Sequence, residues 1–131
     1  MINNSILLLL NNLRNSNLNF NKFIIVENNN LNYSLLKILK NENYINSFFS
    51  FSNKSIKIIL IYKGWWKKVA LISKIKIINQ CQYTNYTNFF NNFKLLKYNQ
   101  GLLIISTNFG LMSHKEAIKL KLGGKILFYI E

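Results

Sequence analysis

The sequence predicts an α+β fold made of two small subdomains. Two segments near the N-terminus carry apolar residues at helical spacing, and strand-like runs of β-branched and aromatic residues follow them. The second half of the chain holds mainly strand-like runs with one short helical segment. With 131 residues, half of them hydrophobic, the chain is long enough to bury a core.

The N-terminal subdomain, residues 1–66, is expected to run in the order α-β-α-β-β. Apolar residues at helical spacing predict its first helix: Ile6, Leu9, Leu10 and Leu13. The second helix should begin from an asparagine cap at or near Asn28 and end before Asn43, which suits a left-handed position. Its buried stripe is predicted to contain Leu31, Leu35, Ile38 and Leu39.

Three strands complete this subdomain. The first is expected over residues 22–26, between the helices. The other two, over 44–51 and 56–62, should form a hairpin whose turn lies at 52–55. A basic segment with two tryptophans, residues 63–68, interrupts the pattern and marks the predicted boundary.

The C-terminal subdomain, residues 67–131, is expected to be mostly β. Strand-like runs cover residues 69–78, 101–106 and 125–130, and residues 80–97 are interpreted as a strand with a turn or short helix. The capping box from Ser113 to Glu116 predicts a short helix before the last strand.

Charge indicates the class of partner. Lysine and arginine number 17 against four acidic residues, a net charge of +13 that a polyanion would neutralise. Nucleic acid is the commonest such partner, and sixteen lysines against one arginine favour phosphate contacts over base reading. We expect no membrane association, since the longest aliphatic run, residues 6–10, is too short for a span.

The sequence offers no catalytic constellation. His114 has no second imidazole or aspartate partner, and Ser113 is better explained as a helix cap than as a nucleophile. The single cysteine, Cys81, excludes an intramolecular disulfide or a multi-cysteine metal site. We therefore expect no enzymatic activity, no metal, no cofactor and no small-molecule substrate.

Residue usage points to an organellar origin. Asn, Lys, Ile, Phe and Tyr, which A+T-rich codons encode, are abundant, and proline is absent. No Arg- and Ser-rich presequence precedes the folded pattern. We expect a mitochondrial protein, with a non-photosynthetic plastid as the alternative.

Residues 101–113, GLLIISTNFGLMS, resemble the signature of the bacterial-type small-subunit ribosomal protein eight family. Glu116-Ala117 and Gly123-Gly124 fall at the spacing that family shows, and residues 13–16 and 38–45 agree more weakly. The resemblance implies a structural protein that binds the central domain of small-subunit rRNA, supports its assembly and contacts neighbouring ribosomal proteins. We do not expect the chain to form homo-oligomers.

The resemblance, together with the basic clusters, predicts these RNA-binding residues: Ser106, Thr107, Asn108, Phe109, Gly110, Met112, Ser113, Gly124, Lys125, Tyr83, Lys67, Lys68 and Arg14. Phe109 replaces the family's usual lysine, and Lys125 its usual acidic residue. An ordinary hydroxyl-capped turn would also explain residues 106–108.

Further alternatives stay open at the sequence level. Tyr83 could be a core or rim residue, and Arg14 could lie on a solvated helix face. Trp65 and Trp66 could stack on RNA or pack between the two halves. For the whole protein, the alternatives are a free-standing RNA-binding or assembly factor and, less favoured, an anionic-surface binder.

Overall fold

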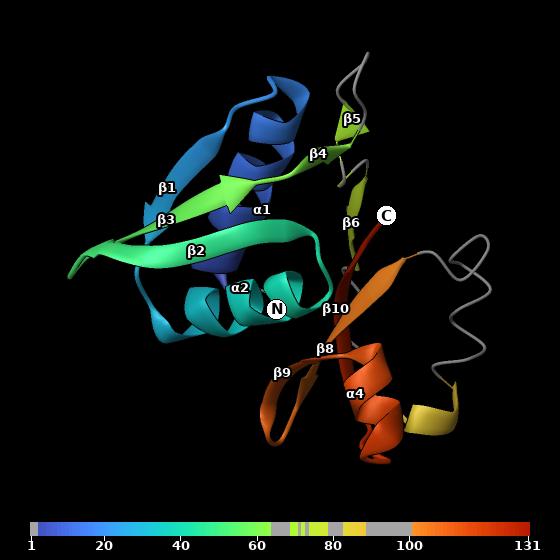
Figure 1. Cartoon of the computed structure of the whole chain (residues 1–131). Helices are drawn as coiled ribbons and strands as arrows, with labels where there is room; N and C mark the ends of the chain where they lie inside the picture. The colour runs from blue at the N-terminus through green and yellow to red at the C-terminus, as the bar shows by residue number, and fades with distance from the viewer. Residues whose placement is uncertain (1–2, 64–68, 71, 73, 79–82, 89–100) are drawn as a thin grey trace. The chain divides into compact units, whose positions relative to one another are not determined.

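The computed structural model describes residues 3–63, 69–70, 72, 74–78, 83–88 and 101–131 (Figure 1). The chain divides into two compact units, an N-terminal one up to residue 73 and a C-terminal one from residue 74. Helices and antiparallel sheets occur together, and a helix precedes the last strand, so the predicted α+β class is confirmed. Of the predicted boundary segment, residues 64–68 lie outside the described residues.

The N-terminal unit has the predicted order of elements. These are α1 (Asn4–Leu18), β1 (Phe23–Glu27), α2 (Asn30–Asn41), β2 (Ile45–Ser52) and β3 (Ser55–Leu60). The strands form an antiparallel sheet in the order β1-β3-β2, and Figure 1 shows α1 behind it. A short ribbon of β4 (Tyr62–Lys63) and β5 (Val69–Ala70) follows.

Asparagine side chains cap the first turn of both helices, and the cap of α2 lies one residue after the predicted Asn28. The Asn3 side chain accepts a hydrogen bond from the Ser5 amide, and Asn29 accepts one from the Asn32 amide at 2.8 Å. Asn43, beyond α2, has the expected left-handed conformation with a φ of 61°. The burial predicted for Leu31 is wrong, because Leu31 is exposed in the first turn of α2.

The C-terminal unit is mostly β. It contains β6 (Ile75–Ile77), β7 (Tyr83–Thr84), a 3₁₀ turn (Tyr86–Asn88), β8 (Leu102–Thr107), β9 (Gly110–Ser113), α4 (His114–Lys119) and β10 (Gly124–Ile130). The sheet order is β6-β10-β8-β9, and β7 also pairs with β10. The sequence analysis predicts no strand over residues 110–113, where the structure has β9, because four residues are too few to show strand periodicity.

One face of this sheet carries a core with α4. The core consists of Leu103, Ile105, Met112, Ala117, Ile126 and Tyr129. The Ser113 hydroxyl accepts from the Glu116 amide at 3.3 Å, so the predicted cap of α4 is confirmed. Within the part of the chain that is described, no helix has both the length and the apolar character needed to span a membrane.

Candidate nucleic-acid interface

The β8–β9 hairpin presents a tip of two residues, Asn108 and Phe109. Its last paired residues are Thr107 and Gly110. The Thr107 hydroxyl donates to the Gly110 carbonyl at 3.0 Å and accepts from the Phe109 amide at 3.2 Å. Gly110 has a φ of 105°, a backbone conformation that residues other than glycine rarely adopt. Thr107 and Gly110 therefore fix the shape of the tip.

The two tip residues are both exposed. The Phe109 side chain is 78% exposed, although its backbone is held by the Thr107 hydroxyl. An exposed ring on a fixed backbone loses little conformational freedom when a flat group stacks on it. The hydroxyl-capped turn considered from the sequence is present, and it leaves Asn108 and Phe109 available for contact.

Strand pairing brings residues from distant parts of the chain to the base of this hairpin. Lys125 in β10 pairs with Ser106 on one side and with Tyr83 on the other, and Ser106 also pairs with Leu111. Directly paired residues of antiparallel strands project from the same face. Tyr83, Lys125, Ser106 and Leu111 thus form one row across the sheet, called here the Lys125 row.

The Lys125 row is accessible. Tyr83 and Lys125 are exposed, and Ser106 and Leu111 are half-buried. The row places one ammonium group between a phenol and a hydroxyl. Such a set can neutralise a phosphate and exchange hydrogen bonds with sugar or base edges, and the Tyr83 ring adds a stacking surface.

The double glycine allows the strands of the row to approach closely. A Cβ atom on Gly124 would collide with the Ser106 carbonyl oxygen and lie 2.8 Å from Cγ2 of Ile105. A Cβ atom on Gly123 would lie 2.6 Å from the Tyr83 phenol oxygen. Gly124 therefore permits the pairing of β10 with β8, and Gly123 permits the position of the Tyr83 side chain.

Not every predicted contact residue lies on this surface. Met112 and Ser113 are buried, Met112 in the core and Ser113 as the cap of α4, and Gly124 is buried under Ser106. Met112 alternates with Leu111 and points into the core, the Ser113 hydroxyl caps α4, and Gly124 lets β10 approach β8, so these three residues support the surface from inside. Sequence reasoning missed Leu111, which alternation with Met112 would have indicated if β9 had been recognised as a strand.

The remaining predicted residues lie elsewhere. Arg14 is exposed on α1 and belongs to the N-terminal unit. Lys67 and Lys68, like Trp65 and Trp66, fall outside the described residues. The structure thus brings together the candidates from β7, β8, the hairpin tip and β10.

His114 has a structural position in this unit. Its side chain is buried, and its Nδ1 accepts a hydrogen bond from the Leu103 amide at 3.0 Å. The described residues contain no group of three or more His, Cys, Asp or Glu side chains that could hold a metal ion.

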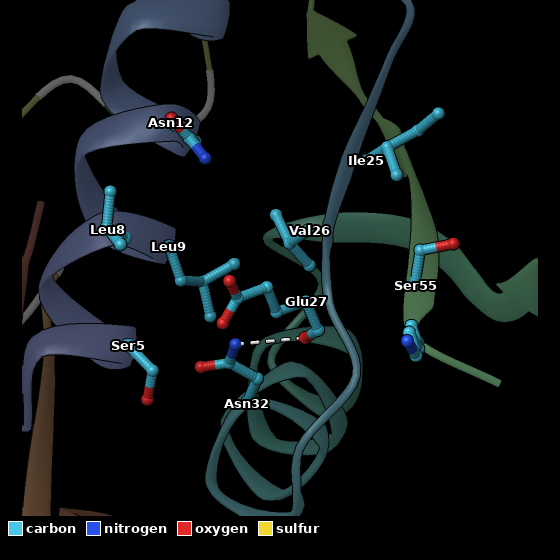
Figure 2. Close-up of a pocket in the computed structure, with 10 residues that line it drawn as sticks. Ser5, Leu8, Leu9, Asn12, Ile25, Val26, Glu27, Asn32 and Ser55 are labelled. Carbon is cyan, nitrogen blue, oxygen red and sulfur yellow. Dashed lines mark hydrogen bonds between the residues drawn. The ribbon is translucent and has the colours of Figure 1, made fainter. Parts of the chain in front are cut away.

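A pocket of about 330 Å³ lies in the N-terminal unit between α1 and β1 (Figure 2). Asn32 donates from Nδ2 to the Glu27 carbonyl at 3.0 Å, and its Oδ1 is buried without a hydrogen-bond partner. Leu8, Leu9 and Val26 supply apolar lining. None of the predicted RNA-binding residues lines this pocket.

Comparison with known proteins shows consistent similarity along the chain. A family model described as ribosomal protein S8 matches residues 4–130. The chain is 31% identical over 133 residues to small ribosomal subunit protein uS8c of Phaeodactylum tricornutum, which covers 99% of both chains.

Two other relatives match over shorter stretches. Small ribosomal subunit protein uS8 of Carsonella ruddii is 38% identical over 74 residues, 55% of this chain and 59% of that protein. Small ribosomal subunit protein uS8c of Euglena gracilis is 39% identical over 77 residues, 59% of this chain and 54% of that protein. The chain therefore spans little more than half the length of these two relatives.

Proposed function

Because this chain belongs to the ribosomal protein S8 family, we propose that it is a structural component of a small ribosomal subunit and binds the central domain of small-subunit rRNA directly. The observation that carries the proposal is the Lys125 row with the adjacent hairpin tip. Ser106, Leu111 and the hairpin tip of this surface come from residues 101–113, on which the sequence resemblance mainly rests.

The proposed mechanism is non-catalytic. A-form RNA offers a wide, shallow minor groove and unpaired elements, which a narrow β-hairpin can approach. Lys125 neutralises a phosphate, and Ser106 and Asn108 exchange hydrogen bonds with sugar hydroxyls and base edges. Phe109 stacks on an unpaired base, a contact that a lysine at this position could not make. The remaining lysines add sequence-independent attraction to phosphates.

We further propose an organellar ribosome as the location. The A+T-rich residue usage and the similarity to two organellar-type uS8c proteins support it. The mitochondrion and a non-photosynthetic plastid are separated by fractionation of the source cells, followed by detection of the protein in each organelle's ribosomes. Detection only in cytosolic ribosomes would contradict the organellar proposal.

The rRNA contact is tested by measuring affinity for separate rRNA fragments over a range of salt concentrations. Tight binding to one central-domain fragment, lost in the double variant Ser106→Ala/Asn108→Ala, is expected. The matched control is Asn46→Ala/Ser50→Ala, which removes the same exposed residue types from β2. Equal losses on cognate and unrelated RNA would refute the assignment of these residues.

A free-standing assembly factor remains the competing function. It would bind the same rRNA but leave the subunit when assembly ends. Sedimentation of mature subunits at moderate salt separates the two, since a structural component stays with the particle.

A further inference from the structure

In the sheet of the N-terminal unit, the face that points away from the core carries exposed apolar side chains. Ile24 and Val26 of β1 point into the core, so their neighbours Phe23 and Ile25 point outward. Two cross-strand rows follow on this side: Phe23, Ile59 and Ser47, then Ile25, Lys57 and Phe49. These six residues are called here the outer sheet face.

The outer sheet face is apolar and accessible. Phe23 is 49% exposed, Ile25 is 51% exposed and Phe49 is 47% exposed. An antiparallel sheet packed on one side normally presents polar residues on the other. A contiguous apolar patch on the surface is typical of a site for protein association.

Lys57 is the single charged residue among the six. Its ammonium lies 4.1 Å from the centroid of the Phe23 ring, and its side chain is half-buried in the middle strand. The lysine is therefore held against the apolar surface. A carboxylate presented by a partner could meet it there, inside a contact from which water is largely excluded.

We propose that the outer sheet face docks another protein of the small subunit, through an apolar strip with a carboxylate that meets Lys57. The inference rests on the proposed function, which supplies neighbouring proteins. An RNA partner fits less well, because Ile25 and Ile59 cannot stack with bases and Lys57 covers one side of the Phe23 ring. A second copy of this chain fits less well, because each copy carries a net charge of +13.

Photo-cross-linking within assembled subunits tests the proposal. A photoreactive phenylalanine analogue replaces Phe49, and the control places it at Leu18, which is 69% exposed on α1 of the same unit. Position 49 should cross-link to one protein, at an apolar segment that contains an acidic residue, well above the yield at position 18. Cross-linking mainly to rRNA or to a second copy, or no excess over position 18, would overturn the proposal.

Affinity for the cross-linked protein, once purified, provides the second measurement. The double variant Ile25→Thr/Phe49→Thr keeps strand-forming residues but removes apolar area, and we expect about ten- to hundredfold weaker binding. Lys57→Glu should weaken binding to the cross-linked protein, whereas Lys57→Arg, which keeps the positive charge, should bind it as the natural chain does. Leu18→Gln is the control, and an equal effect of this variant would count against the surface.

The rRNA affinity of the same variants distinguishes a failure of the docking proposal from a failure of the proposed rRNA-binding function. If the outer sheet face is a protein-docking site only, Ile25→Thr/Phe49→Thr binds the rRNA fragment as the natural chain does. A chain that binds rRNA but shows no protein contact at position 49 disproves the docking surface alone. A chain that neither binds rRNA nor sediments with subunits disproves the proposed function itself.

Discussion

The buried Leu103 amide donates a hydrogen bond to Nδ1 of His114, across 3.0 Å and eleven positions of sequence. This bond connects β8 to the first residue of α4, and the two elements enclose the core of the C-terminal unit. The only histidine of the chain thus satisfies a backbone donor that would otherwise be buried without a partner.

Replacing His114 with Phe should destabilise the protein by about 1–3 kcal/mol, because the Leu103 amide loses its acceptor. His114→Asn places an amide oxygen near the position of Nδ1 and should preserve the bond. Hydrogen exchange at the Leu103 amide is the direct measurement. Exchange at this amide should be faster in His114→Phe than in His114→Asn. Equal exchange rates in the two variants would show that the hydrogen bond does not protect the Leu103 amide.

Gly124→Ala should disrupt the pairing of β10 with β8, at a cost of about 1–3 kcal/mol or more, because its Cβ meets the Ser106 carbonyl and a buried Ile105 methyl group. We expect reduced rRNA affinity together with the stability loss, measured by urea unfolding and by fragment binding.

Gly123→Ala is the informative control for the glycine pair. Its Cβ would meet the end of the Tyr83 side chain, which can rotate away, and would lie 3.0 Å from the Thr84 carbonyl oxygen. The loss of stability should be smaller than in Gly124→Ala, and a Tyr83→Ala background should reduce it further. If Gly123→Ala is as harmful as Gly124→Ala in both backgrounds, the side-chain explanation fails.

Phe109→Ala should weaken binding to the cognate rRNA fragment by about 1–3 kcal/mol, the range typical of a base stacked on an aromatic ring. Since the ring is 78% exposed, stability in urea should remain unchanged. Phe109→Trp should retain affinity, whereas Phe109→Lys should lose the stacking contact and steepen the salt dependence. Full affinity in Phe109→Ala would show that the ring does not touch RNA.

Stability should fall at alkaline pH through Tyr44. Burial raises the pKa of the Tyr44 phenol, and the nearby Glu42 carboxylate raises it further. The folded chain therefore keeps this proton at a pH where the unfolded chain has released it. The contribution is fully present below about pH 10 and is lost as the pH rises through the raised value.

Urea unfolding at several values between about pH 8 and 11 tests this prediction. Tyr44→Phe should lose less stability than the natural chain over that range. Tyr33→Phe, which changes an exposed tyrosine of the same unit, serves as the control. Parallel curves for the natural chain and Tyr44→Phe would contradict it.

Local patterns account for most of the predicted elements. Asparagine caps, the left-handed Asn43 and the box from Ser113 to Glu116 act over a few residues, so the sequence shows them directly. Leu31 was misjudged because its spacing fits the stripe, although the buried position in that turn belongs to Asn32. The strand β9 was missed because its pairing with β8, rather than its own periodicity, makes it a strand.

By itself, the sequence determined the fold class, the order of the elements, the strong positive charge and the family resemblance, since all of these follow from residue type and short-range spacing. Only the tertiary structure decided which residues share a surface. Register places Tyr83 and Ser106 on either side of Lys125 and turns Met112 inward. The physical reason is that a shift of one residue in strand pairing moves every side chain to the opposite face.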